Sequence, residues 1–187
     1  LDHLAARGGS VTTDDLVRVA RASIVLRRVT IALVEKVLAP SVLPAPAASA
    51  PELFEELAAE VAFVDLDNGV LRLREELRVP ALVALRLADP ELVQRVHEAA
   101  AQFYDPPGTA SEATELAYHR LALGASVEEF EDATLRRLDE AAINLPPSAA
   151  IAVHEVIRDP AARAAGRDLD AWESTALPTA DAALRDG

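Results

Sequence analysis

The chain of 187 residues contains no cysteine and no methionine. Without cysteine it can form neither a disulfide bond nor a thiolate metal site. Because no methionine precedes Leu1, we expect the sequence to be a piece of a longer protein, in which any catalytic chemistry lies elsewhere. The sequence has no apolar run long enough to cross a membrane and no basic leader with a cleavage site. These absences lead us to expect a cytoplasmic protein without membrane contact.

Aromatic residues and lysine are also scarce, with 4% aromatics and Lys36 as the single lysine. Hydrophobic residues make up 51% of the chain, and they are mainly Leu, Val and Ala, as in a helical core without a cofactor pocket. The net charge is −13, although residues 1–40 carry +2. Since a phosphate backbone needs neutralising Lys and Arg, we do not expect this chain to bind nucleic acid. The abundance of Ala and Arg is typical of a bacterial protein.

Catalytic motifs are absent from the sequence. It has no G-x-S-x-G, and Gly8-Gly9-Ser10 lacks the Gly-Lys-Ser/Thr of a phosphate-binding loop. His97 and His119 lie in the middle of predicted helices, with Ala101 and Leu123 four residues further on, so neither helix offers a two-histidine metal clamp. We therefore predict no catalytic, cofactor-binding or metal-binding residue. Structural or surface roles are predicted for His3, His154, Trp172 and the acidic pairs Asp14-Asp15, Glu55-Glu56 and Glu128-Glu129.

A single β-hairpin is predicted among the helices, and it is the most informative local feature. Asn68-Gly69 is a strong hairpin turn, because both residues tolerate the positive φ of a type I′ turn. The flanking strands run over 63–66 and 70–74. The apolar residues of these strands then share one face, which must pack on helices. The predicted register places Leu66 opposite Leu71, Val64 opposite Leu73, and Asp65 opposite Arg72 as an exposed ion pair.

Three helices are predicted before the hairpin. A loop rich in Pro and Ala, residues 40–50, separates the second helix from the third. Three helices followed by a hairpin are typical of a winged helix, a variant of the helix-turn-helix, and we assign this domain to residues 1–88. The signals for the three helices are Thr12 with Asp15, Thr30 as a cap with Pro40 as a stop, and Ser49 with Glu52 as a capping box.

Further helices are predicted after the hairpin. A linking helix has Pro80 in its first turn, and the next helix begins at Asp89-Pro90. Successive helices joined by tight breaks favour TPR-like antiparallel α-hairpins over residues 89–187, with the last hairpin, around Trp172, cut off at the C-terminal end. The start signals of the later helices are Thr109 with Glu112, Ser126 with Glu129, and Ser148.

Two stretches of these helices resemble a known family. One contains His97-x-x-Ala100-x-x-x-Tyr104, and the other contains Tyr118-His119-x-Leu121-x-x-Gly124. Both are similar to a segment of large bacterial signal-transduction ATPases of the STAND and NACHT kind, which are AAA-like. In that family a winged helix follows the nucleotide-binding module, and a TPR-like array comes next. The resemblance covers roughly residues 15–125, includes Val29-Thr30 and Val37-Leu38-Ala39-Pro40 as the entry to the winged helix, and contains no Walker residue.

The resemblance implies a regulatory role and not a reaction. One partner would be the upstream nucleotide-binding module of the same chain, which would hold ATP and Mg; we expect neither cofactor in residues 1–187. The helical region would bind a protein partner or self-associate, and so couple nucleotide state to partner sensing or oligomerisation. Two alternatives remain. One is a DNA-binding winged-helix transcriptional regulator, which the acidic charge disfavours, and the other is a stand-alone hydrolase, for which no nucleophile–base set is visible.

Overall fold

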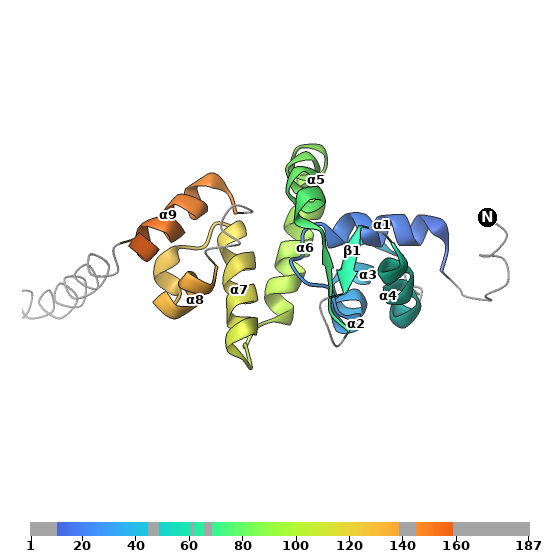
Figure 1. Ribbon diagram of the computed structural model, residues 1–187, viewed down its shortest axis with the longest axis horizontal. Coiled ribbons are helices and arrows are strands. Elements are labelled where there is room, and N and C mark those ends of the chain that lie inside the picture. The colour runs from blue at the N-terminus through green and yellow to red at the C-terminus, as the bar shows by residue number, and fades with distance from the viewer. Residues whose placement is uncertain (1–10, 45–48, 61, 66–68, 139–144, 159–187) are drawn as a thin grey trace, which may run out of the picture. The chain divides into compact units, whose positions relative to one another are not determined.

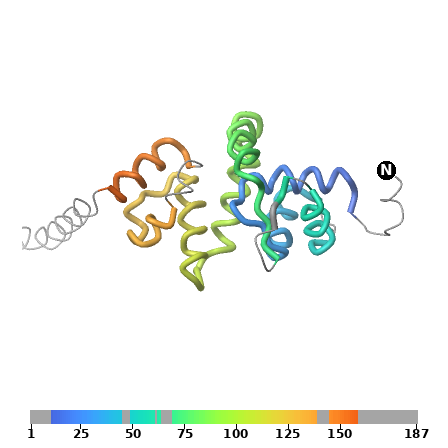
Figure 2. Tube along the Cα trace, in the orientation of Figure 1, coloured from blue at the N-terminus to red at the C-terminus, as the bar shows by residue number. Residues whose placement is uncertain are grey.

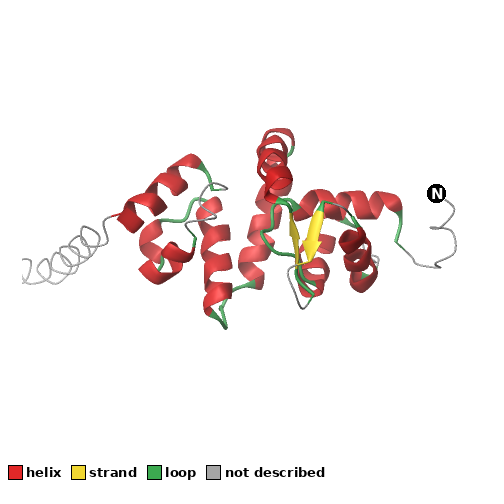
Figure 3. Ribbon diagram, viewed as in Figure 1, coloured by secondary structure: helices red, strands yellow, loops and turns green. Residues whose placement is uncertain are grey.

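The computed structural model describes residues 11–44, 49–60, 62–65, 69–138 and 145–158. These residues are mostly helical, which confirms the predicted fold class at that level. The chain divides into two compact units, Leu1–Ala125 and Ser126–Gly187. In the first unit one short hairpin lies among helices (Figures 1 and 3). The winged-helix assignment of residues 1–88 and the TPR-like assignment of residues 89–187 stay predictions.

Three helical segments precede the hairpin, and two of their predicted caps form. Thr12 and Asp15 make a reciprocal capping box, and the Thr30 hydroxyl accepts from the Leu33 N–H at 3.2 Å. Ser49 is the N-cap of the third segment, but its side chain makes no capping hydrogen bond, so the predicted capping box is wrong there. The segments are α1 (Thr13–Ser23), the continuous run of α2 (Ile31–Leu33), η2 (Val34–Leu38) and α3 (Ala39–Val42), and α4 (Ala50–Ala59).

The second segment passes through Pro40, so the predicted stop at this residue is wrong. A proline has no N–H, and in a regular α-helix its ring clashes with the carbonyl of residue i−4. The element just before α3 is η2, a π-helix, whose wider turn changes the spacing of the hydrogen bonds. The chain can therefore stay helical to Val42.

The predicted hairpin is present, but its register differs by one residue. Its strands are β1 (Phe63–Asp65) and β2 (Leu71–Leu73). The backbone of Asp65 is not paired with that of Arg72, so the predicted pairing of these two residues is wrong. A one-residue shift exchanges the two faces of a strand, and here it turns Phe63 to the interior, where its side chain is buried. The observed pairs are Phe63 with Leu73, Val64 with Arg72, and Asp65 with Leu71.

A third extended residue joins this hairpin. Val29, between α1 and α2, exchanges two backbone hydrogen bonds with Leu71, each of 2.8 Å. Gly69 has a φ of +78°, as the predicted turn requires. Leu66 and Asn68, which the prediction also used, lie outside the described residues.

Three longer helices complete the first unit. Asp89 caps one of them by accepting from the Leu92 N–H at 3.1 Å, and Thr109 caps the next, both as predicted. The linking helix begins at Glu75, so Pro80 lies inside it and the predicted first-turn position is wrong. Gly124, with a φ of +95°, ends the last helix. The helices are α5 (Glu75–Ala88), α6 (Pro90–Phe103) and α7 (Ala110–Ala122).

Helix α6 joins the N-terminal core to α7. It packs against η2, α3 and α5, and also against α7. Figure 2 follows the chain from the N-terminal helices through α6 into α7. The core beside α6 is aliphatic, as the composition predicts. Its members with no exposed surface are Val19, Ala22, Val25, Val34, Val37, Leu38, Leu53, Leu57, Val96 and Ala100.

The second unit is described over residues 126–138 and 145–158. The helix predicted from Ser126 is wrong beyond its first turn, because the buried Phe130 is extended and separates two short helices. In the last helix Val153 and Val156 are buried while Ile151 is 59% exposed. The elements are η3 (Val127–Glu129), α8 (Asp132–Arg137) and α9 (Pro147–Arg158).

Candidate functional site

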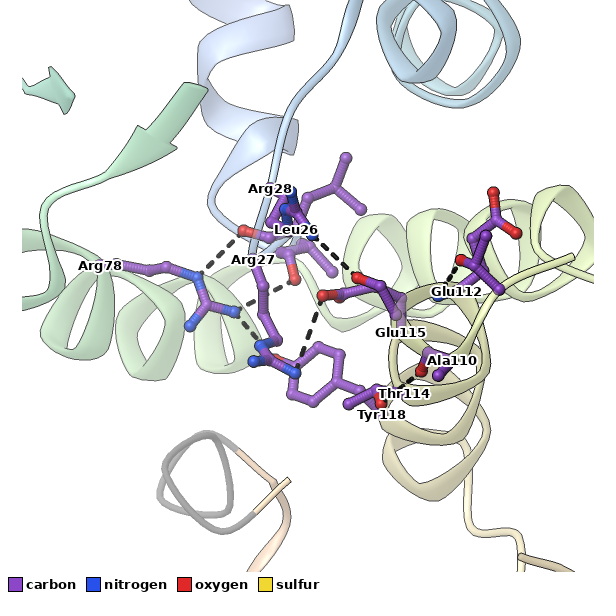
Figure 4. Close-up of polar contacts among 12 residues, drawn as sticks. Leu26, Arg27, Arg28, Arg78, Ala110, Glu112, Thr114, Glu115 and Tyr118 are labelled. Atoms are coloured by element: carbon purple, nitrogen blue, oxygen red, sulfur yellow. Dashed lines mark hydrogen bonds and ion pairs between the residues drawn. The ribbon is translucent and has the colours of Figure 1, made fainter. Parts of the chain in front are cut away.

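Polar side chains gather in the interior of the first unit, where α7 packs against α6 (Figure 4). Polar groups in a dry interior must find partners or they cost free energy. The contacts of these side chains therefore define what the cluster can do. The polar cluster consists of Arg78 from α5, His97 from α6, Glu115, Tyr118 and His119 from α7, and Arg27 from the connection between α1 and α2.

Arg78 is the main hydrogen-bond donor of the polar cluster and is 2% exposed. Its Nε donates to the carbonyl of Leu26 at 3.1 Å, and its Nη2 donates to the carbonyl of Val25 at 3.4 Å and to the Tyr118 hydroxyl at 2.9 Å. The carbonyls belong to the residues just after α1, where a helix end leaves such groups without partners. Arg78 therefore fastens α5 and α7 to the end of α1.

Two guanidinium groups lie close to the Tyr118 ring. The Cζ atom of Arg27 is 5.5 Å from the centre of the Tyr118 ring, and that of Arg78 is 5.9 Å away, both within cation–π range. Arg27 also forms an ion pair with Glu115, in which the Arg27 Nη1 and the Glu115 Oε1 are 3.8 Å apart (Figure 4). Burial raises the pKa of the Glu115 carboxyl, while the nearby guanidinium groups of Arg27, Arg28 and Arg78 act in the opposite direction.

His97 and His119 meet across the α6–α7 interface. Their Nδ1 atoms are 2.8 Å apart, so one imidazole donates and the other accepts. This bond requires that at least one ring be neutral, and burial lowers both pKa values. The pKa of His97 falls to about 3, with smaller contributions from the charges of Arg86 and Arg78. The pKa of His119 also falls far below its usual range, through burial and then through His97, Arg78 and Arg27.

The chemistry open to this cluster is limited by burial. Both imidazoles are at most 2% exposed, so a substrate could not reach them without separation of α6 and α7. In the described part of the chain, no three His, Asp or Glu side chains are grouped to hold a metal ion. None of the helices described is long and apolar enough to cross a membrane. The cluster is suited to setting the relative positions of α1, α5, α6 and α7.

The sequence singled out only part of this cluster. His97 and His119 were each considered alone, and the structure brings them together from separate helices. His154 is exposed on α9, and His3 and Trp172 lie outside the described residues. No sequence motif indicated Arg78, Arg27 or Glu115. For Arg78 a signal was present, because it precedes the buried residues Leu82 and Leu85 at helical spacing and so occupies an apolar stripe.

Comparison with known proteins gave no relative: no protein-family model, no curated protein and no solved structure matches the chain.

Proposed function

We propose that residues 1–187 are a non-catalytic regulatory segment of a multidomain STAND-type ATPase. In this proposal a winged helix, residues 1–88, is followed by TPR-like helical hairpins, residues 89–187. The observation that carries the proposal is the bridge between Val29 and Leu71. An extended residue between the first two helices, paired with the second strand of a hairpin that follows the third helix, is the arrangement expected of a winged helix.

The α6–α7 interface gives a second line of support. Three residues of the two helical patterns that resemble the ATPase family, His97, Tyr104 and His119, meet in this interface. His97 contacts His119, the Tyr104 and His119 rings stack with their centres 6.1 Å apart, and Ala100 and Leu121 are buried. Gly124 supplies the positive φ that ends α7. The two sequence patterns are thus packing patterns of one helical pair, which suits a segment that works by position and contact.

A regulatory segment must transmit a structural change from one helix to another, and the contacts of the polar cluster could do this. Arg78 bonds to the end of α1 and to Tyr118 of α7, and Arg27 contacts the same ring and Glu115. A displacement of α7 by a partner would break or strain these contacts and would act on the connection that enters α2. We infer that nucleotide state in an upstream module, which would hold ATP and Mg, is coupled in this way to a protein partner or to self-association. The setting would be the cytoplasm of a bacterium.

The alternative function, DNA binding by the winged helix, is less well supported than a regulatory role, because the helix that would contact DNA is acidic. In a winged helix the third helix enters the major groove, and here that helix would be α4. Its side chains include Glu52, Glu55 and Glu56 and no Lys or Arg. Such a surface repels phosphates, which agrees with the overall charge of −13.

The parent gene provides the decisive test. The region upstream of Leu1 should encode a strand, then G-x-x-x-x-G-K-[ST], then a helix, and a later strand ending in an Asp for magnesium. The full protein should bind ATP, and replacement of the Lys in that motif by Ala should abolish binding, whereas residues 1–187 alone should bind none. An upstream region without a P-loop would refute the ATPase proposal. Sequence-dependent, salt-sensitive binding of a DNA duplex by residues 1–187 would favour the transcriptional regulator instead.

A further inference from the structure

An open cavity of about 320 Å³ lies beside the polar cluster, at the first turns of α7. The proposed regulatory function makes no use of it. Its wall combines residues from the connection before α2, from the end of α6 and from α7. The lining residues that matter here are Arg28, Phe103, Tyr104, Ser111, Glu112 and Glu115.

The polar groups of the wall are held in place before any ligand arrives. The Arg28 Nη1 donates to the Ser111 hydroxyl at 2.9 Å, and the Gly108 N–H donates to the Glu112 Oε2 at 2.8 Å. A guanidinium group carries five N–H donors, and the bond to Ser111 uses one of them. Arg28 is exposed and can therefore bind an anionic group in the cavity through its remaining donors.

Glu115 is the unusual member of the wall. Its side chain lines the cavity although the residue is only 5% exposed. Its ion pair with Arg27 is 3.8 Å long, which is beyond hydrogen-bond distance. A carboxylate at the wall of the cavity, held only by a contact of this length, can accept from a closer donor that enters the cavity. An ammonium group supplies both the donors and the opposite charge.

The charges and the shape of the cavity limit the ligand further. Arg28, Glu112 and Glu115 line the cavity, and Arg27, which does not line it, contacts Glu115. With Arg27 included the local charges balance, so the site favours a ligand with no net charge that carries both signs. The rings of Phe103 and Tyr104 lie edge to face with centres 5.1 Å apart and give the cavity an apolar wall.

We propose that this cavity binds a free α-amino acid with an apolar side chain. The ligand's carboxylate contacts Arg28, its ammonium group contacts Glu115, and its side chain packs against Phe103 and Tyr104. Binding would tie the connection before α2 to α7, and so would act on the same helices as the polar cluster. The proposal does not depend on the ATPase assignment, because it concerns only the first unit of this chain.

The test is isothermal titration calorimetry, which measures the affinity of residues 1–187 for L-leucine and for two blocked analogues. L-Leucinamide lacks the carboxylate and N-acetyl-L-leucine lacks the ammonium group. We expect L-leucine to bind with a Kd of about 1 mM or lower and each analogue to bind at least about tenfold more weakly, as the loss of one charge-assisted contact implies. The proposal is refuted if L-leucine, L-valine, L-methionine and L-phenylalanine all fail to bind at about 10 mM, or if an analogue binds as tightly as L-leucine.

Variants assign each contact to its residue. Arg28→Gln should remove the preference for L-leucine over L-leucinamide, and Glu115→Gln should remove the preference over N-acetyl-L-leucine. Glu98→Gln, an exposed change on α6 outside the cavity, is the matched control and should bind like the parent. Because Arg28 is exposed, its variant keeps the test decisive even if the buried Glu115→Gln protein does not fold. Retention of both preferences in the Arg28→Gln protein would overturn the proposal.

Discussion

Replacement of Arg78 by methionine tests the main claim about the polar cluster. Methionine keeps an unbranched apolar stem of similar length and removes the guanidinium group. The carbonyls of Val25 and Leu26 and the Tyr118 hydroxyl would then lose their donor inside the protein. Arg78→Met should therefore destabilise the first unit and loosen the attachment of α5 and α7 to the end of α1.

The size of this loss of stability can be worked out from the three contacts that Arg78→Met removes. Hydrogen bonds to a charged group contribute roughly 1.5–3 kcal/mol each, and the bond to Val25, at 3.4 Å, is the weakest of the three. Burial of the guanidinium group is itself costly, and methionine removes that cost. A buried acceptor left without its donor costs about 1–3 kcal/mol, so loss of the closer bonds to Leu26 and Tyr118 should give a net destabilisation of about 2–5 kcal/mol. Such a loss is a large part of the total stability of a domain, about 5–15 kcal/mol.

The assay must report on the first unit alone. Urea titration followed by hydrogen exchange and mass spectrometry resolves peptides from α6 and α7 from those of α9. The α6 and α7 peptides of the variant should lose protection at lower urea concentration than those of the parent. Arg95→Met is the matched control, because Arg95 lies on the exposed side of α6, and it should change stability by less than about 0.5 kcal/mol. Equal unfolding of the Arg78 and Arg95 variants would refute the structural role of Arg78.

Three further results are expected. Gly69→Val should lower the free energy of unfolding by about 1–2 kcal/mol, because a β-branched residue resists the φ of +78°. The cause is backbone strain alone, since a Cβ at this position meets no atom within 4 Å. An unchanged midpoint in thermal melts would contradict the turn. Lowering the pH from about 6.5 to about 4 should destabilise the first unit. In this range a histidine in the unfolded chain takes up a proton, whereas His97 in the folded protein, with a pKa of about 3, stays neutral. In urea titrations, His97→Gln should therefore weaken the dependence of stability on pH. Leu57→Ala, in the core, should lower the free energy of unfolding by about 2–5 kcal/mol. Leu87→Ala, at an 84% exposed position, should lower it by less than about 0.5 kcal/mol. Similar urea midpoints for the two variants would contradict the described core.

The features that the sequence predicted correctly depend on near neighbours. The caps at Thr12, Asp89 and Thr109 form because a side-chain oxygen meets an N–H three residues further on. The positive φ at Gly69 is equally local. Such contacts need no knowledge of the rest of the fold, and they were enough to predict helices separated by one hairpin.

The features that were missed depend on distant partners. The register of the hairpin was wrong because burial of Phe63 and the bridge from Val29 decide it, and neither is visible in the turn sequence. Pro40 did not stop its helix because a π turn precedes it. In the polar cluster, Arg78 and Tyr118 are 40 positions apart. A sequence shows that Arg78 interrupts an apolar stripe, but the identity of its partners requires the packed structure.

The histidine pair also supplies a natural spectroscopic reporter. The proton between the two Nδ1 atoms is enclosed by α6 and α7 and is shielded from solvent. In an NMR spectrum such a proton should exchange slowly with water and give an imidazole N–H resonance separate from those of exposed histidines. The resonance exists only while the two helices are docked, so its loss would record their separation without any introduced label. Any partner that separates α7 from α6 would thus reveal itself through an atom that the protein already carries.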